Sequence, residues 1–169
     1  MNTNRTFIIV THQMIYGAPQ ALKDYLNEKK VKQLLFIGLS FLTQNTSSLQ
    51  VYKSGRKMSE KKIHRSNTIG MRDYFVDFFQ VLWWVLKEKE TYDTFIGVNG
   101  LNCLAGLFLK KIGKVKKVIF YTIDFVPIRF RNKLLNFIFH RIEIICVKYA
   151  ATFVKELRYI PYHQSQNLA

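Results

Sequence analysis

Residues 120–130, FYTIDFVPIRF, bring an acidic side chain, a proline and an arginine together directly after an apolar run. Asp124 could hydrogen-bond a sugar hydroxyl or act as a general base, and Arg129 could pair with that carboxylate or with a phosphate. Pro127 predicts a rigid turn between them. The same spacing also fits a buried Asp124–Arg129 pair that only braces the loop, and the sequence leaves both interpretations open.

Three other loops follow apolar runs and carry polar groups. The segment 12–19 contains Tyr16 and Gly17 and enters a helix. Gly17 can let a ligand approach the backbone, and a helix N-terminus favours an anion, although an ordinary strand–helix turn explains the same residues equally well. Asn99 is interpreted as a helix cap rather than a ligand contact. Residues 43–45 offer only hydroxyl and amide groups.

Several well-known chemistries have no signature in this chain. The loop at 12–19 is neither GxGxxG nor a P-loop, so it indicates neither a dinucleotide site nor an NTPase site. The four histidines lack ligand spacing, and no metal site is predicted. Cys103 and Cys146 are far apart, which argues against a zinc site or a disulfide scaffold and favours reduced thiols. No hydrolase triad is visible.

The elements that must position these loops follow from hydrophobic patterning. Four near-continuous apolar runs predict strands buried on both faces of a parallel sheet: Phe7–Thr11, Leu34–Phe41, Thr94–Val98 and Val118–Ile123. Helical spacing predicts helices over 18–29 and 101–112, between the strands. Alternating strands and helices predict right-handed βαβ units and a doubly wound, mostly parallel α/β sheet. Residues 43–70, with a strand-like piece at Leu49–Tyr52, are predicted to form a loop or small hairpin.

Two further helices are predicted over Met71–Glu90 and Arg131–Ala150, each with a main apolar stripe and apolar outliers. We expect the stripes to pack against the sheet: Tyr74, Phe75, Phe78, Val81, Leu82, Val85 and Leu86 in the first, and Leu134, Leu135, Ile138, Ile142, Ile145 and Tyr149 in the second. Trp84 falls on the acidic side of the first helix, and Phe137 and Ile144 lie opposite the stripe of the second. These outliers either pack inside the protein or mark a surface that contacts a membrane or a second domain.

Length and charge set the broad class. The chain has 169 residues, 49% of them hydrophobic, and 26 Lys+Arg against 11 Asp+Glu give a net charge of +15. One folded domain is expected. The cationic excess favours nucleic acid, anionic lipid headgroups or phosphorylated substrates. No apolar stretch approaches the roughly 20 residues needed to cross a bilayer, so a cytoplasmic protein is expected, soluble or peripheral on the inner face of the plasma membrane.

A further set of short segments lies in the second half of the chain: YDTFIGVN (92–99), Gly106, KKIG (110–113), VIFYTIDFVPIRF (118–130), NKLLN (132–136) and Cys146-Val147. In these segments the chain resembles the N-terminal domain of family 4-type (group 1) glycosyltransferases. The resemblance covers residues 5–150 and is most specific over 93–150. It implies GT-B architecture, in which two Rossmann-like domains face each other across a cleft.

The resemblance also implies roles for residues. Residues 1–150 would be the acceptor-side domain, with Asp124 the candidate catalytic residue and the cleft lined by Tyr16, Gly17, Asn99, Tyr121, Asp124 and Arg129. Trp84, Phe137 and Ile144 would face a membrane or a partner domain. The family binds its nucleotide-sugar donor in a C-terminal domain with paired glutamates, so no cofactor is expected on these residues. The tail 151–169 is expected to lack the strand, turn and helix that would continue the fold.

The function implied is the acceptor side of sugar transfer from a nucleotide-sugar to a glycan or lipid-linked acceptor. Alone, the chain is expected to be catalytically incomplete, as a truncated product or as a half-enzyme whose donor domain is a separate polypeptide. Two alternatives stay open: a non-catalytic membrane-anchoring subunit of a split glycosyltransferase, and a basic nucleic-acid-binding α/β module. The last has no recognition motif, and its aromatic residues do not form a stacking platform.

Overall fold

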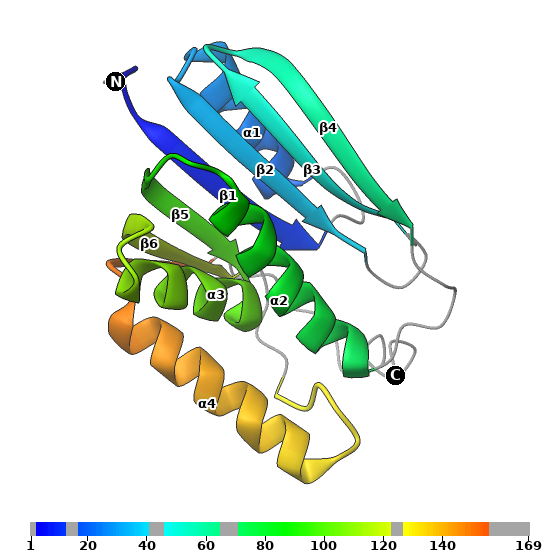
Figure 1. Ribbon diagram of the computed structural model, residues 1–169. Helices are drawn as coiled ribbons and strands as arrows, with labels where there is room; N and C mark the ends of the chain where they lie inside the picture. The colour runs from blue at the N-terminus through cyan, green and yellow to red at the C-terminus, as the bar shows by residue number, and fades with distance from the viewer. Residues whose placement is uncertain (1–2, 13–16, 41–45, 65–70, 123–126, 156–169) are drawn as a thin grey trace.

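The computed structural model describes residues 3–12, 17–40, 46–64, 71–122 and 127–155. Within these ranges all strands join one seven-stranded sheet in the order β4-β3-β2-β1-β5-β6-β7 (Figure 1). The elements follow one another as β1 (Thr6–His12), α1 (Ala18–Glu28), β2 (Gln33–Leu39), β3 (Thr46–Lys53), β4 (Arg56–His64), α2 (Met71–Lys87), β5 (Tyr92–Val98), α3 (Gly100–Lys111), β6 (Val115–Thr122), α4 (Lys133–Tyr149) and β7 (Thr152–Lys155).

The sheet is mostly parallel, as the continuous apolar runs predicted. Strands β2, β1, β5, β6 and β7 are parallel, and β3 and β4 extend the sheet as an antiparallel hairpin. Taken in chain order, the parallel strands lie 2-1-3-4-5, an order found in doubly wound sheets. The predicted α/β class is therefore confirmed, and the architecture is consistent with a Rossmann-like fold.

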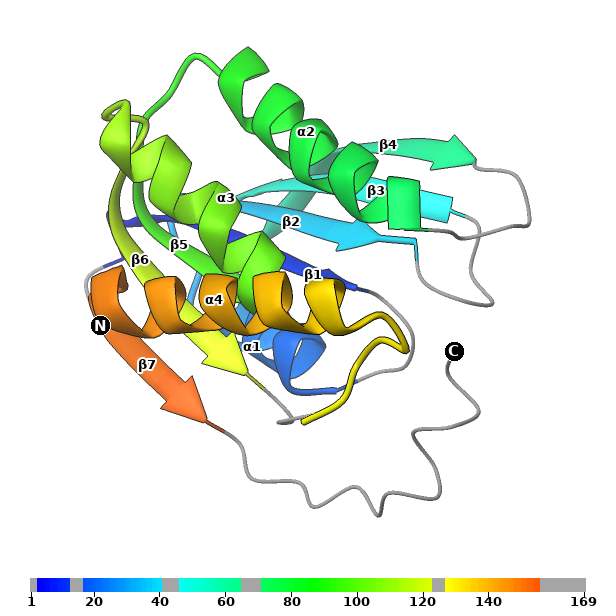
Figure 2. The ribbon, with the colours of Figure 1, turned by 90° about the horizontal axis from the view of Figure 1, so that it is seen from below.

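Helices cover both faces of the sheet (Figures 1 and 2). On one face, α1 packs on β1 and β2 through a core that includes Phe7, Ile9, Leu26, Leu34 and Phe36. On the other face, α2, α3 and α4 form a layer over a larger core that includes Ile8, Val10, Leu35, Phe95, Val118 and Phe120. Because β1 is buried on both faces, its residues alternate between the two cores.

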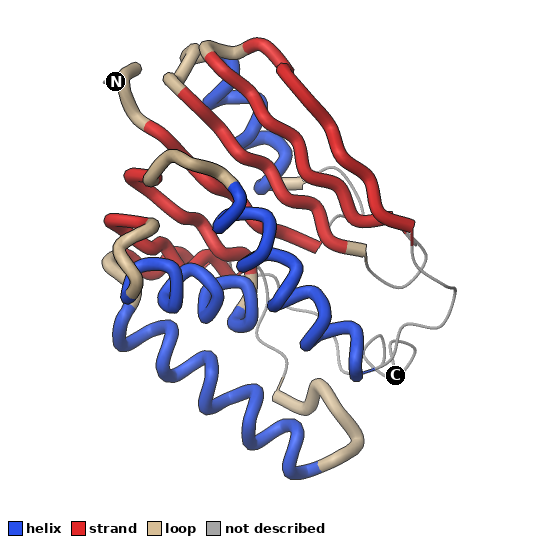
Figure 3. Tube along the Cα trace, in the orientation of Figure 1, coloured by secondary structure: helices blue, strands red, loops and turns tan. Residues whose placement is uncertain are grey.

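The polar segment after β2 forms a hairpin that is larger than the predicted one. Strands of eight and nine residues replace the single strand-like piece Leu49–Tyr52. Ser54 and Gly55 turn the chain with φ of 49° and 79°, the paired positive angles of the tight turns that suit strand twist. All nine residues of β4 are exposed, which explains why the strand carries no apolar run. Figure 3 shows the hairpin at one edge of the sheet.

The sheet continues beyond Ala150, contrary to the expectation for the tail. The amide of Ala151 donates a hydrogen bond to the carbonyl of Val118 at 2.9 Å, and β7 then pairs in parallel with β6. The expectation that no strand follows residue 150 is therefore wrong. Four residues are too short a run to stand out by periodicity, and the strand exists because β6 offers an open edge.

The apolar stripe expected for α2 is also partly wrong, because the helix turns a different side to the core. Trp84 is 6% exposed, so of its two alternatives it packs inside the protein and does not face a membrane or a partner domain. Its neighbour Trp83 is 60% exposed. Asp77, Val81 and Val85 share the buried side with Trp84, while Phe75 and Leu86 of the expected stripe are exposed. A helix that is apolar on nearly every side gives no unique buried face by periodicity.

Helix α4 shows the same kind of shift. Phe139 and Cys146 are buried on it, whereas the expected stripe residues Leu134, Ile138, Ile145 and Tyr149 are exposed. Phe137 and Ile144 are also exposed, 55% and 57%, so of the two alternatives for them the packing inside this chain does not hold. Much of the apolar surface of α4 therefore lies outside the core.

The two cysteines, remote in sequence, are free and buried between α3 and α4. The Cys146 thiol donates to the carbonyl of Gly100 at 3.3 Å. Hydrogen bonding with Cys146, together with burial, raises the pKa of the Cys103 thiol. Both residues act here as small core side chains rather than as reactive thiols.

Candidate ligand-binding site at the carboxyl edge of the sheet

His12 and Asn99 meet where two neighbouring parallel strands end. His12 is the last residue of β1, and Asn99 directly follows β5, which pairs with β1. The two side chains are joined by a hydrogen bond of 2.8 Å between Asn99 Nδ2 and His12 Nδ1. The chain after β1 leads to α1 on one face, and the chain after β5 leads to α3 on the other. Doubly wound sheets bind their ligands at this point of divergence.

The hydrogen bonds of Asn99 define the proton positions on His12. Asn99 Oδ1 accepts the amide of Asn102 at 3.3 Å, as an N-cap of α3, so its Nδ2 group is the one that faces His12. Nδ1 of His12 must then accept, and in the neutral imidazole the proton lies on Nε2. Nε2 lies 3.6 Å from Oδ2 of Asp77, a buried carboxylate on α2. The His12 ring thus lies between the amide group of Asn99 and the carboxylate of Asp77.

The backbone of Asn99 adopts an unusual conformation, with φ of 73° and ψ of 169°. Residues other than glycine rarely adopt this region, which costs about 1–3 kcal/mol and is concentrated at functional sites. The conformation is held from both sides, because the amide of Asn99 donates to Tyr121 O and its carbonyl accepts from Cys103, each at 3.0 Å. The amide side chain of Asn102 also donates to Val98 O at 2.8 Å.

Aromatic residues connect this polar cluster to the loop before α4. Tyr74 on α2 makes edge contacts with the His12 ring, at 6.3 Å between ring centroids, and with Phe130, at 6.0 Å. Phe130 in turn contacts Phe139 of α4 at 6.0 Å. The Arg129 guanidinium lies over the Phe139 ring at 4.7 Å, a cation–π contact. This chain of rings forms an apolar wall beside the His12–Asn99 pair.

Polar groups hold the same loop against α4. Oδ1 of Asn136 accepts the amides of Arg129 at 2.9 Å and Phe130 at 2.8 Å, and its Nδ2 donates to Phe130 O. Both ring nitrogens of His140 face acceptors, the Pro127 carbonyl at 2.9 Å and Glu143 Oε2 at 3.1 Å. The hydrogen bond to Pro127 and the contacts with Glu143 raise the pKa of His140. The imidazolium form satisfies both acceptors.

The structure brings several of the residues expected at the site to this edge. Asn99 is the cap of α3, as predicted, and its amide bonds to the backbone of Tyr121. Gly17 is the N-cap of α1, and its own amide donates to Gln20 Oε1 at 3.1 Å. Arg129 lies over Phe139, as described above. Tyr16 and Asp124 fall outside the described residues, so the proposed Asp124–Arg129 pair stays a prediction.

Sequence reasoning missed His12 and Asp77 as site residues. Asp77 is one of the acidic residues on the side of α2 that carries Trp84, and both residues are buried. They are seven residues apart, two helical turns, so they must share a face. The signal that could have found Asp77 was therefore the large tryptophan on its side of the helix. His12 was visible only as the first residue of the loop at 12–19.

The cluster offers neutral donors and acceptors, one buried carboxylate and adjacent aromatic rings. These groups suit a ligand rich in hydroxyls, because such a ligand both donates and accepts hydrogen bonds. Within the described ranges, no group of three or more His, Cys, Asp and Glu side chains is arranged to hold a metal ion. None of the described helices combines the length and apolar character needed to cross a membrane.

The fold and the site define a mostly parallel α/β protein with a polar cluster at the divergence point of its sheet. Comparisons with protein-family models, with curated proteins and with solved structures found no match for this chain.

Proposed function

We propose that this chain is the acceptor-side domain of a GT-B-type glycosyltransferase, which transfers a sugar from a nucleotide-sugar to a glycan or lipid-linked acceptor. The observation that carries the proposal is the His12–Asn99 pair at the divergence point of the sheet, 2.8 Å between side chains and with a strained backbone at Asn99. An acceptor hydroxyl needs both a donor and an acceptor, and this cluster supplies them beside an apolar wall.

The segments that carry the sequence resemblance support the same proposal. Two of them, 92–99 and 118–130, contain β5 and the last five residues of β6, together with residues that follow each strand. Asn99, Tyr121 and Arg129 belong to these segments. In this proposal Asp124, which follows β6 in the sequence, remains the candidate catalytic residue. The donor nucleotide would be bound by the second domain of the architecture, and no cofactor is assigned to residues 1–169.

An NMR titration tests the proposal. The 15N-labelled chain is titrated with millimolar N-acetylglucosamine and with glucose as acceptor probes. We expect amide shifts at Asn99, Asn102 and Tyr121, and their loss in His12→Ala. The matched control, His64→Ala, changes an exposed histidine on β4 and leaves the shifts in place.

Two results would count against the proposal. Shifts confined to other parts of the sheet would place the sugar site elsewhere. Tight binding of a nucleotide-sugar to this chain alone, measured by calorimetry, would contradict the division into acceptor and donor sides. A His12→Ala variant that retains the wild-type amide spectrum away from the site verifies that lost shifts do not reflect unfolding.

A second candidate function, membrane attachment on the cytoplasmic side, is favoured by the composition of the helix layer, which the next subsection develops. The nucleic-acid alternative has less support, because the sequence has no recognition motif and the layer also exposes aliphatic side chains such as Leu86, Ile138 and Ile144, on which bases do not stack.

A further inference from the structure

The outer surface of the helix layer has an unusual composition. Every exposed residue of α2, α3 and α4 among the described side chains is apolar, aromatic or cationic. None is acidic, and none is an uncharged polar residue. The cations are Arg72, Lys87, Lys110, Lys111, Lys133, Arg141 and Lys148, and the large apolar residues include Phe75, Phe79, Trp83, Leu86, Phe108, Leu134, Phe137, Ile144 and Tyr149.

This segregation of charge is specific to the layer. On the opposite face of the sheet, α1 exposes Asp24 and Glu28, and the basic edge strand β4 includes Glu60. Within the layer, Asp77 is buried, and Asp73 and Glu143 are largely buried. Glu90, three residues beyond the end of α2, is exposed. The three helices themselves expose seven cations and no carboxylate, which makes their outer surface complementary to an anionic partner.

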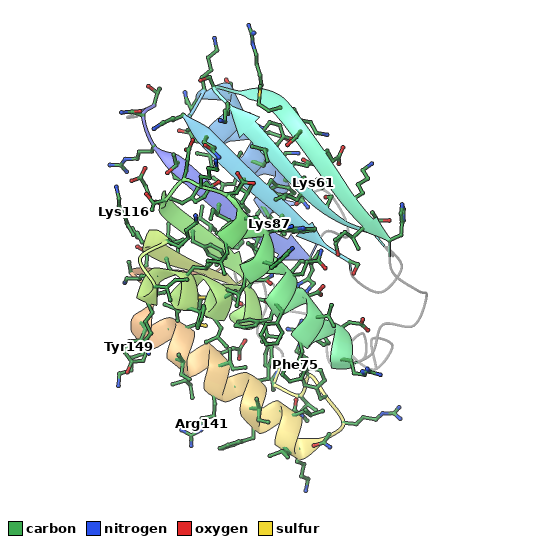
Figure 4. All side chains as sticks on the ribbon, viewed as in Figure 1. Lys61, Phe75, Lys87, Lys116, Arg141 and Tyr149 are labelled. Carbon is green, nitrogen blue, oxygen red and sulfur yellow. The ribbon has the colours of Figure 1, made fainter. Side chains whose placement is uncertain are left out.

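Cations and aromatic rings are paired on this surface. The Nζ of Lys87 lies 4.4 Å from the Trp83 ring centroid, the guanidinium of Arg141 lies 4.9 Å from Phe137, and Nζ of Lys148 lies 5.4 Å from Tyr149. Figure 4 labels Lys87, Arg141 and Tyr149 on α2 and α4. Side chains of these types bury their apolar parts at a lipid interface while the charged group stays among headgroups.

A groove of about 760 Å³ runs between the three helices, with Phe78, Phe108, Ile145 and Tyr149 among its walls. Lys110 and Lys111, at the end of α3, also line it. The groove therefore offers apolar walls to an acyl chain and two ammonium groups to a phosphate. The cores of protein–protein interfaces are depleted in lysine, so this mixture fits a lipid surface better than a protein partner.

We propose that the outer surface of α2, α3 and α4 is a docking surface for a bilayer that contains anionic phospholipids. The aromatic and aliphatic side chains enter the interface, and the lysines and arginines contact lipid phosphates. Membrane docking is independent of sugar transfer. The docking proposal can therefore be refuted while the proposed function stands, and the proposed function can be refuted while the docking proposal stands.

Tryptophan fluorescence with vesicles tests the insertion step. The chain has two tryptophans, and only Trp83 is exposed. In Trp84→Phe, emission comes from Trp83 alone and is expected to shift to the blue with vesicles of phosphatidylglycerol and phosphatidylcholine, but not with phosphatidylcholine alone. In Trp83→Phe, the vesicles still bind, and the emission of the already buried Trp84 stays constant.

Charge reversal tests the contact with headgroups by vesicle flotation, which does not depend on how well Trp84→Phe folds. Lys110→Glu/Lys111→Glu should weaken binding to the anionic vesicles at least tenfold, because each lysine near an anionic surface contributes substantially to attraction. The matched control Lys29→Glu/Lys30→Glu makes the same charge change at the end of α1, on the opposite face of the sheet, and should weaken binding less than about threefold (Figures 1 and 2). Phe79→Ser should weaken binding about tenfold at constant charge.

Several outcomes would overturn the proposal. Equal losses in the two charge-reversal variants would show attraction by net charge without a docking surface. Equal binding to neutral and anionic vesicles would remove the role of the cations. An absent blue shift in a folded Trp84→Phe variant would exclude insertion at Trp83. A vesicle-free dimer that Phe79→Ser dissociates would assign the surface to a second copy of the chain instead, and duplex DNA binding lost only in the α3 variant would assign it to nucleic acid.

Discussion

Asn99 Nδ2 donates to His12 Nδ1 across 2.8 Å, and this bond joins the carboxyl ends of β5 and β1. The same asparagine caps α3 and holds a backbone conformation that glycine adopts far more easily. One residue therefore links two strands, starts a helix and orients an imidazole. The backbone strain is stable because hydrogen bonds to Tyr121 and Cys103 fix the residue on both sides.

Substitutions of Asn99 separate these roles. Asn99→Ala removes the cap and leaves a Cβ in the strained region, and we expect a loss of about 1 kcal/mol or more in the free energy of unfolding. Asn99→Gly also removes the cap but relaxes the backbone, so it should be more stable than the alanine variant by about 1 kcal/mol or more. Urea unfolding measures both values. Equal stabilities would show that the backbone at this position is not strained.

Trp83 and Trp84 give a direct test of which side of α2 is buried. Trp84→Ala empties a site in the main core and should cost about 3–5 kcal/mol. Trp83→Ala removes a side chain that is 60% exposed and should change stability by no more than about 0.5 kcal/mol. Thermal or urea unfolding of the two variants measures these losses of stability. A larger loss in Trp83→Ala would contradict the orientation of the helix.

Thr6 and Asp93 form a reciprocal contact at the amino ends of β1 and β5. Asp93 Oδ2 accepts from the amide of Thr6 at 3.0 Å and from its hydroxyl at 3.1 Å, and Thr6 Oγ1 accepts the Asp93 amide at 2.9 Å. The hydrogen bond from Lys116, followed by the Thr6 amide, lowers the pKa of Asp93.

A lowered pKa in the folded state means that this carboxylate stabilises the protein above its unfolded pKa of about 3.9. The contribution is lost as the pH falls through the lower, folded value. Asp93→Asn should therefore reduce stability at pH 7 by about 1 kcal/mol, with the difference from wild type vanishing in acid. Urea unfolding of both proteins between pH 2 and pH 7 measures this difference in stability. A difference that stays constant across that range would show that the charge of Asp93 does not cause it.

His140 predicts the opposite dependence on pH. Its pKa is raised by the hydrogen bond to the Pro127 carbonyl and by Glu143, so its contribution is complete below the unfolded pKa of about 6.5. The contribution disappears as the pH rises through the higher, folded value. We expect His140→Gln to lose stability relative to wild type at pH 5.5 and to approach it at pH 8.5.

Glu143→Gln provides the matched test, because it removes one of the two acceptors of His140 and leaves Pro127 in place. In this variant the NMR titration midpoint of His140 should be lower than in wild type. A midpoint equal to wild type would mean that Glu143 does not contribute to the shift.

The central strands were predictable because apolar runs such as Phe7–Thr11 and Leu34–Phe41 have the length of strands and are bounded by polar segments. The hairpin was predictable only in part, because β4 is exposed along its whole length and carries no apolar run. The buried faces of α2 and α4 were not predictable. Both helices carry apolar residues on several sides, and tertiary packing selected Trp84 and Phe139 for the core. β7 was missed because its four residues form a strand only by pairing with β6.

The candidate site was predictable only in part, for a different reason. Asn99 was identified from its place before a helix, which is a local signal. Its partnership with His12 connects residues 87 positions apart, and Asp77 reaches the same place from a third element. No local pattern encodes such a meeting, which depends on the order of the strands in the sheet.

That order also has a consequence for how the protein is made. β1 lies in the middle of the sheet, where Phe7 pairs with Leu34 on one side and with Thr94 on the other. During synthesis the first partner follows quickly, but the second leaves the ribosome only after roughly 90 residues. In this interval an apolar strand has one open edge, and such edges recruit other chains. Aggregation of nascent chains should therefore be most sensitive to the delay between the synthesis of β1 and that of β5.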